Sequence, residues 1–339
     1  MLVSEFDFDL PEGLIAQKPP ARRDAGRMLV VGEELLDKGI RDFADFLRPG
    51  DAVVFNDSRV VPCRFDAAAG DGAAYEITLH TRAAGGRWWG FAKKFGKLKI
   101  GDKLTLADGT RIEIIEKNDE SGLLIRFDRE DVFDALDKVG KIPLPPYIKR
   151  DGDDADRERY QTVYAEPPGS MAAPTAGLHF TPELLGAIEK AGAKIAKITL
   201  HVGAGTWMPV KAEDTKDHKM HSEWGVIAPE QAEIINGARR VVAVGTTSLR
   251  LLESAAAKQN AGARIAPFSG TTNIFITPGY DFKAADVLLT NFHLPKSTLF
   301  MLACAFAGTN EMKAAYAHAV LEKYRFFSYG DCCLLFKKT

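Results

Sequence analysis

Residues 239–257, RRVVAVGTTSLRLLESAAA, contain a short apolar run, a glycine and then a hydroxyl-rich helix start. This order predicts a buried strand, a tight turn and an α-helix. Strand and helix segments of the same kind occur in DAVVFNDS (51–58), PELLGAIEKAG (182–192), AKIAKITLHVG (193–203), ADVLLTNFH (285–293) and STLFMLACAFAG (297–308). Their alternation predicts an α/β fold with a mainly parallel sheet, whose ligands bind beyond the carboxyl ends of the strands.

A different pattern occupies residues 74–127, where short runs of alternating apolar and polar residues lie between turn signals. The runs AYEITLHTR, RWWGFAKKF, DKLTLADG, TRIEIIEK and GLLIRF predict a small antiparallel β-barrel. A short helix and the proline-rich connector KIPLPPYIKR (141–150) follow. We therefore expect a discontinuous α/β domain over residues 1–59 and 148–339, interrupted by an inserted barrel domain over residues 60–147.

The length and composition of the chain exclude several classes of protein. The chain has 339 residues, enough for two domains, and a net charge of −2, so a polyanionic partner must be met by a local patch. Cys63, Cys304, Cys332 and Cys333 have no CxxC spacing, which argues against a disulfide framework and against a zinc site. The start of the chain lacks an apolar leader, and the apolar stretch 299–308 is too short to span a bilayer. We expect a cytoplasmic protein that does not enter a membrane.

Histidines are concentrated in one part of the chain, since five of the seven lie between His179 and His293. They occur in APTAGLHFT (173–181), TLHVGAGTW (199–207), HKMHSEW (218–224) and TNFHLPKST (290–298). Imidazole titrates near neutral pH, and the glycines and threonines around it let backbone and hydroxyl groups approach a ligand. This composition is typical of an active site, although any one histidine could instead be a buried hydrogen-bonding group.

The segment GTTS (245–248) allows two interpretations. Thr246, Thr247 and Ser248 could simply cap the following helix, or they could hold a carboxylate or phosphate together with free backbone N–H groups. Arg250 favours the anion site.

The segment HKMHSEW (218–224) allows three interpretations. His218, His221 and Glu223 could act as acid and base, bind a metal, or lie in a surface loop without a role. Because no thiolate accompanies them, acid/base work or substrate contact is favoured over a metal. In TNFHLPKST, Asn291 and His293 should leave the end of a strand, where ligands of parallel sheets bind.

The barrel run WWGFAKKFGKLK (88–99) mixes aromatic residues with Lys93, Lys94, Lys97 and Lys99. Such a mixture could follow a phosphate backbone and stack bases. It is also typical of a barrel that buries its aromatic residues and exposes lysines for solubility, and this interpretation is slightly favoured.

These segments occur together with LPEGLIAQKP (10–19), FNDSRVVPCR (55–64), YQTVYA (160–165), IFITPGY (274–280) and YRFFSYGD (324–331). In this order they resemble the S-adenosylmethionine:tRNA ribosyltransferase-isomerase family of queuosine biosynthesis, and the match runs nearly from end to end. The resemblance implies a larger α/β domain interrupted by a small β-barrel, and no metal. The chain departs from the usual sequence motifs of the family at Asn273, Thr277, Trp207 and Cys332–Cys333, none of which is a histidine.

The activity that the resemblance implies is transfer and isomerisation of the ribosyl moiety of S-adenosylmethionine. The acceptor is 7-aminomethyl-7-deazaguanine at the tRNA wobble position, and epoxyqueuosine-tRNA, adenine and methionine are formed. S-adenosylmethionine is then a consumed substrate, no cofactor is needed, and tRNA is the macromolecular partner of an expected monomer. Competing interpretations are a tRNA-binding protein without activity and a methyltransferase, which lacks support because no glycine-rich strand-turn-helix occurs near the start.

The reaction needs at least one base and one acid, and the resemblance places candidates on matching segments. The implied catalytic residues are His179, His201, His221, His293 and Glu223. The implied substrate-binding residues are Thr175, Phe180, Trp207, Trp224, Thr246, Thr247, Ser248, Arg250 and Asn291. We favour His201 or His293 as the base, because each closes an apolar strand run, and we expect His80 in the barrel to lie outside the site.

Overall fold

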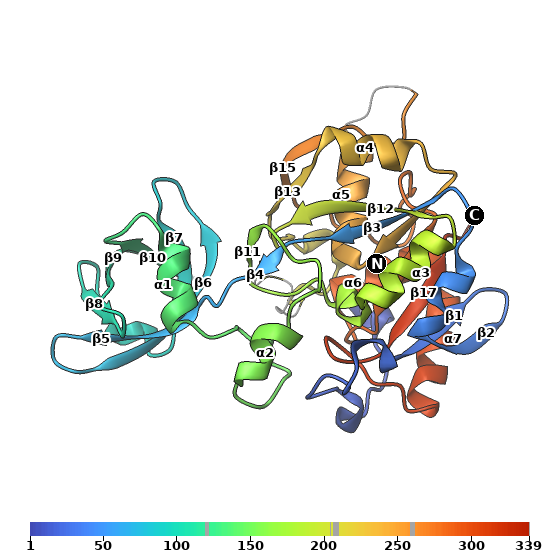
Figure 1. Ribbon diagram of the computed structural model, residues 1–339. Helices are drawn as coiled ribbons and strands as arrows, with labels where there is room; N and C mark the ends of the chain where they lie inside the picture. The colour runs from blue at the N-terminus through green and yellow to red at the C-terminus, as the bar shows by residue number, and fades with distance from the viewer. Residues whose placement is uncertain (119–121, 204, 206–209, 258–261, 339) are drawn as a thin grey trace.

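The computed structural model describes residues 1–118, 122–203, 205, 210–257 and 262–338 (Figure 1). The larger of its two units is built on a nine-stranded sheet flanked by helices, and it carries both ends of the chain. The smaller unit is a closed six-stranded barrel. The predicted fold, an α/β domain interrupted by a small antiparallel barrel, is confirmed. None of the helices in the described ranges is long and apolar enough to cross a membrane.

The large sheet is mixed. Its strands follow the order β15 (Phe268–Thr272), β13 (Glu223–Ile227), β12 (Lys194–Leu200), β3 (Asp51–Asn56), β14 (Arg240–Val244), β16 (Val287–Asn291), β17 (Cys332–Phe336), β1 (Arg27–Val31) and β2 (Leu35–Gly39). The neighbours β12, β3, β14 and β16 pair in parallel, as the alternation of strand and helix predicts, whereas antiparallel pairs form both ends of the sheet. The parallel centre therefore brings the carboxyl ends of four strands to one edge.

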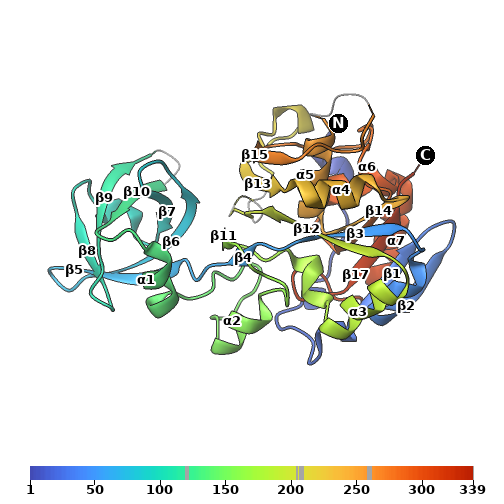
Figure 2. The same ribbon diagram turned by 45° about the horizontal axis from the view of Figure 1, so that its top comes forward.

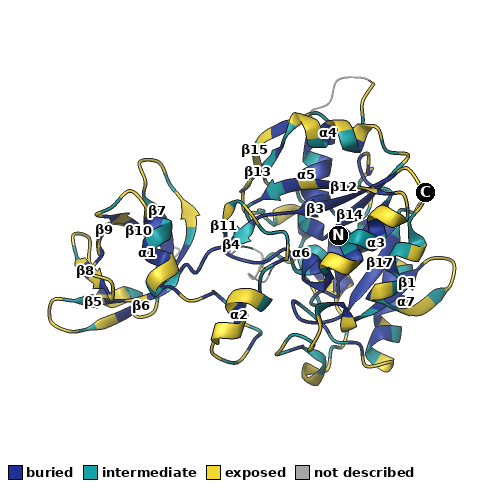
Figure 3. Ribbon diagram, in the orientation of Figure 1, coloured by how far each residue is buried: buried dark blue, intermediate teal, exposed yellow. Residues whose placement is uncertain are grey.

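Helices cover both faces of this sheet because alternate residues of its central strands point to opposite sides. In β14, Val241 and Ala243 belong to one core, and Val242 and Val244 belong to the other. The first core is completed by α4 (Pro229–Asn236), α5 (Thr246–Ala256), α6 (Thr298–Ala307) and α7 (Thr309–Leu321), and the second by α3 (Pro182–Lys190). Figure 3 shows the central strands buried, while α3 and α4 expose part of their surface.

The barrel strands follow the closed order β10 (Gly122–Phe127), β7 (Trp88–Ala92), β6 (Ala74–Arg82), β5 (Arg64–Ala69), β8 (Lys103–Leu106) and β9 (Arg111–Lys117). Tyr75, Ile77 and Leu79 of β6 point into the barrel, and α1 (Val132–Val139) packs against the same core. The sequence pattern missed β5, whose run RFDAAA alternates weakly. All six strands fall within the range expected for the inserted domain, although its exact limits stay a prediction.

Two chain segments connect the barrel to the larger unit (Figure 2). The incoming segment contains β4 (Arg59–Val60), which pairs in parallel with β11 (Pro168–Ser170) beyond the outgoing segment. The outgoing segment carries α2 (Asp154–Arg159), where Asp156 accepts two hydrogen bonds from Arg150, both at 2.7 Å. The Tyr329 hydroxyl donates to the same Asp156 carboxylate at 2.8 Å and attaches this connector to the larger unit. The barrel lies beside the carboxyl-end edge of the sheet.

Candidate active site

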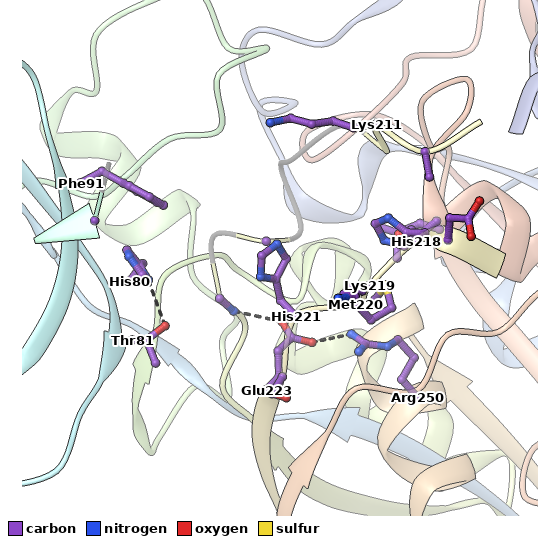
Figure 4. A pocket seen from close by; sticks show the side chains of 18 of the residues that line it. His80, Thr81, Phe91, Lys211, His218, Lys219, Met220, His221, Glu223 and Arg250 are labelled. Carbon is purple, nitrogen blue, oxygen red and sulfur yellow. Dashed lines mark hydrogen bonds and ion pairs between the residues drawn. The ribbon is translucent and has the colours of Figure 1, made fainter. Parts of the chain in front are cut away.

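Two hollows lie near the carboxyl ends of the central strands. The inter-domain cavity, of about 720 Å³, is bounded by His80, Thr81, Phe91 and Asn118 of the barrel and by Lys211, Asp217, His218, Lys219, His221, Glu223, Arg250, Thr298 and Leu299 of the larger unit (Figure 4). The strand-end pocket, of about 290 Å³, is bounded by Tyr147, Thr175, Thr246, Thr247, Thr290, Asn291, His293, Lys296, Leu299, Phe327 and Ser328. Because Leu299 belongs to both walls, the two hollows are neighbours.

The start of α5 forms one side of the strand-end pocket. Gly245, the residue before the helix, has a φ of +90°, a conformation that favours glycine, and no side chain caps the helix. The Ser248 hydroxyl donates to the Val244 carbonyl at 2.8 Å. Thr246 and Thr247 line the pocket, and within the described ranges the Thr247 hydroxyl has no hydrogen-bond partner. Capping therefore does not explain the hydroxyl-rich sequence, and Thr247 is available to a ligand.

The end of β16 forms the opposite side. Asn291 donates from Nδ2 to the Phe327 carbonyl at 2.9 Å, yet its Oδ1 atom has no partner among the described residues although the residue is only 2% exposed. Nε2 of His293 lies 2.8 Å from Oγ1 of Thr290. Burial lowers the pKa of His293 to about 3, so its imidazole is neutral at physiological pH.

The sequence did not predict a third wall of the strand-end pocket. The Tyr147 hydroxyl lies 2.6 Å from Oγ of Ser328, and the Tyr147 and Phe327 ring centroids are 4.1 Å apart. Phe327 has a φ of +73°, which is uncommon for a bulky residue. These contacts join the connector 141–150 to the segment 324–331. Both segments match sequence motifs of the family, but no local sequence pattern indicates that they are in contact.

A buried ion pair forms the floor of the inter-domain cavity. Glu223 and Arg250 are paired through Oε2 and Nη1, with side chains 6% and 5% exposed. The other Glu223 oxygen accepts from the Gly203 backbone N–H at 3.0 Å, and Arg250 also donates to the Ile274 carbonyl at 3.3 Å. Arg250 therefore lies in this cavity, away from the pocket beside GTTS. Figure 4 shows the pair below His221.

Basic and imidazole side chains gather above that floor. His218, His221, Lys211 and Lys219 all line the cavity, and the His218 ring packs edge-on against Phe275 at 5.1 Å. Within the described ranges, no group of three or more His, Cys, Asp and Glu side chains could hold a metal ion. His218, His221 and Glu223 are thus neighbours in one wall, as their spacing predicts, without forming a metal cluster.

The barrel contributes His80 to the same cavity, so the expectation that this histidine lies outside the site is wrong. Burial, and secondarily the charge of His221, lowers the pKa of His80 to about 4. Phe91 lines the cavity beside it. Figure 4 shows both rings on the barrel side and His221 on the other. The sequence pattern of residues 88–99 had indicated aromatic residues and lysines as the barrel's contribution to binding, but not His80.

Comparison with known proteins identifies the family. A family model described as queuosine biosynthesis protein matches residues 3–335. A protein of Rhodospirillum rubrum named S-adenosylmethionine:tRNA ribosyltransferase-isomerase is 53% identical over 342 residues, covering 99% of this chain and 98% of its own. This chain belongs to the queuosine biosynthesis protein family. A relative of the same name from Methylocella silvestris is 50% identical over 99% of this chain and 98% of its own. The crystal structure of S-adenosylmethionine tRNA ribosyltransferase from Thermotoga maritima is 32% identical, with a TM-score of 0.56, over 98% of this chain and 99% of that one.

Several residues implied by the resemblance to the queuosine family lie outside both hollows. His179 is buried, with its pKa lowered to about 4 by desolvation, and Phe180 packs between Phe43 and Phe55 in the core. His201 stacks on Trp224 with ring centroids 5.7 Å apart. Trp207 lies outside the described residues. The roles of these residues stay predictions.

The barrel lysines also lie outside the inter-domain cavity. Lys93 pairs with Glu76 at 3.0 Å, and Lys94, Lys97 and Lys99 are exposed. Their contact with a phosphate backbone stays a prediction, whereas Lys211 and Lys219 line the cavity itself.

Proposed function

We propose that this queuosine family protein is an S-adenosylmethionine:tRNA ribosyltransferase-isomerase. It transfers and isomerises the ribosyl moiety of S-adenosylmethionine onto 7-aminomethyl-7-deazaguanine at the tRNA wobble position, and forms epoxyqueuosine-tRNA, adenine and methionine. The observation that carries the proposal is the sequence identity of 53% and 50% with two relatives of that name, in each case over 99% of this chain. The family segments also converge in space, because they supply most of the walls of both hollows.

S-adenosylmethionine is assigned to the strand-end pocket. This pocket lies at the carboxyl ends of parallel strands, the usual ligand position in such sheets, and its volume is near the lower end of the range for small-molecule sites. The unpartnered Oδ1 of Asn291 and the Thr247 hydroxyl offer hydrogen bonds to a polar ligand. Tyr147 and Phe327 offer aromatic faces, which attract a cationic sulfonium.

The tRNA is assigned to the inter-domain cavity. That cavity is larger, lies between two domains and carries Lys211 and Lys219, whose charge suits a phosphate backbone. Because Leu299 lines both hollows, an acceptor base bound in the cavity would lie next to a donor bound in the pocket.

The chemistry requires a base near the ribose of the donor. The sulfonium acidifies the C5′ protons, so a positioned base removes one and adenine leaves. The tRNA amine then attacks, and an epoxide forms as methionine departs. His293 is our first candidate because it lies in the strand-end pocket just after β16, and His221 in the neighbouring cavity is the second.

No cofactor takes part in this scheme, since S-adenosylmethionine is consumed. We place the enzyme in the cytoplasm as a monomer, where tRNA is available. Turnover should be unaffected by EDTA under conditions that keep tRNA folded. Loss of turnover that added zinc or magnesium restores would show that a metal is required.

The deciding experiment is incubation with S-adenosylmethionine and tRNA carrying the aminomethyl-deazaguanine. We expect adenine and methionine in equal amounts, only with the modified tRNA, and a matching mass change in the product nucleoside. Release of S-adenosylhomocysteine would instead show a methyltransferase, and binding of tRNA without any release would show a tRNA-binding protein.

A further inference from the structure

An irregularity in the barrel places His80 at the inter-domain cavity. In the antiparallel pair β6–β7, Leu79 pairs with Gly90 and Thr81 with Trp89, so His80 is an extra residue without a partner. Such a β-bulge turns a side chain in a new direction and is frequent beside functional sites. A Cβ at Gly90 would lie 2.9 Å from the Thr78 carbonyl oxygen, so the strands approach closely only because this position is glycine.

The bulge brings two aromatic rings together on the outside of the barrel. Ile77 and Leu79 point into the barrel core, whereas His80 lines the cavity outside it, and its ring stacks on Phe91 with centroids 4.3 Å apart and planes at 26°. Nδ1 of His80 lies 3.0 Å from Oγ1 of Thr81, which fixes the direction of the imidazole. Both rings are half-buried and line the cavity.

The surroundings of this pair favour a base of a nucleic acid over other ligands. The wall of the larger unit carries Lys211 and Lys219, so an aromatic surface faces basic side chains across one cavity (Figure 4). Aromatic rings with basic groups beside them are the usual combination for splayed single-stranded bases. The low pKa of His80 keeps its ring uncharged at neutral pH, so stacking requires no desolvation of a cation.

We propose that His80 and Phe91 form the stacking surface for the wobble base of tRNA, which leaves its own stack to enter the inter-domain cavity. The inference rests on the proposed function for the identity of the base. It assigns substrate contact to the barrel through these two rings, in addition to any lysine contact with phosphates. The adenine of S-adenosylmethionine is excluded from this surface, because the donor occupies the strand-end pocket.

The test uses the full chain and an anticodon stem-loop RNA with 2-aminopurine at the wobble position. We expect its fluorescence to change on binding to the wild type, and Phe91→Ala and His80→Ala to abolish that change. Loss of a stacked base should raise the Kd of the RNA by about 5- to 150-fold. The ring-preserving variants Phe91→Tyr and His80→Phe should retain both the fluorescence change and the affinity. The Kd of S-adenosylmethionine should be the same in all variants.

Phe95→Ala is the matched control, because Phe95 is a half-buried aromatic residue of the same barrel that packs on Lys117 at 4.0 Å. Equal fluorescence and Kd in Phe91→Ala, His80→Ala and the wild type would overturn the inference. So would a rise in the Kd of S-adenosylmethionine alone. If the ring-preserving variants lose the fluorescence change while thermal unfolding shows them folded, stacking is also overturned. A wild type that binds the RNA with the expected fluorescence but forms no epoxyqueuosine would contradict the proposed function and leave the stacking surface in place.

Discussion

The strand-end pocket and the inter-domain cavity adjoin but differ in chemistry. Among the described residues that line the pocket, Lys296 is the one formal charge, and its ammonium is held 2.8 Å from Asp7. The cavity wall contains both signs, including the buried Glu223–Arg250 pair. The pocket therefore suits a small donor in a dry site, and the cavity suits a polyelectrolyte. One fold thus offers two adjoining hollows that differ in burial and charge.

The largest effect should come from removing the base. If His293 is that base, His293→Asn should lower turnover by roughly 10²- to 10⁴-fold, because Asn keeps some hydrogen bonding but cannot titrate. Exchange of deuterium at C5′ of S-adenosylmethionine should slow in parallel. His221→Asn tests the cavity in the same way, and His179→Asn and His201→Asn test histidines outside both hollows.

His318→Asn is the control for these variants, since His318 pairs with Asp37 and lines neither hollow. If His201→Asn loses most of its turnover while His293→Asn and His221→Asn keep near-normal turnover, the base lies outside both hollows. Near-normal turnover in all four would exclude these four histidines, and His80, His218, Glu223 or a tRNA group would have to carry the step.

The next largest effect concerns stability at the cavity floor. Arg250→Met should lower the free energy of unfolding by about 3–5 kcal/mol, because Glu223 is left charged and buried without its partner. The double variant Glu223→Gln with Arg250→Met should recover much of this loss. Urea unfolding followed by circular dichroism measures both. An Arg250→Met protein as stable as the wild type would show that water or ions reach Glu223, so the cavity floor is wetter than its burial indicates.

Sequence patterns predicted the strand-end pocket better than the cavity for a physical reason. The carboxyl ends of parallel strands meet at one edge in every such sheet, so Asn291, His293 and GTTS could be brought together from the sequence. The position of His80 depends on a bulge and on the close approach at Gly90, which are set by pairing between strands. A glycine inside the strand run WWGF was the available signal.

The same distinction applies to the fold. Strand and helix pairs with local periodicity were predicted, whereas β1, β2 and β17 were missed because their place in the sheet depends on long-range pairing. Cys332 and Cys333, which depart from the family words, lie in β17 and contribute to opposite faces of the sheet. Adjacent buried residues on two faces are typical of a strand covered on both sides.

A smaller effect should appear in acid. The pKa values of His179 and His293 are lowered by burial to about 4 and about 3, so the unfolded chain, with an ordinary pKa of about 6.5, binds protons that the folded chain does not. Their contribution to stability is complete above pH 6.5 and is lost as the pH falls below it, by about 3 kcal/mol per group at pH 4. His179→Gln should flatten this part of the curve of unfolding free energy against pH. Parallel curves for wild type and variant would show that the pKa of His179 is the same in the folded and the unfolded chain.

The smallest effect compares lysines of the two domains. The logarithm of the tRNA association constant falls linearly with the logarithm of the salt concentration. Replacing Lys211 and Lys219 by alanine should reduce the magnitude of this negative slope by about 1.4, or about 0.7 for each phosphate of a single-stranded loop that is no longer neutralised. Lys93→Ala with Lys97→Ala should lower it less, because Glu76 already holds the Lys93 ammonium. The affinity for S-adenosylmethionine should not change in either variant, since none of the four lines the strand-end pocket. Filter binding at several salt concentrations measures the slopes. A greater decrease in the barrel pair would move the phosphate path to the outer surface of the barrel, and the cavity would then receive the base alone.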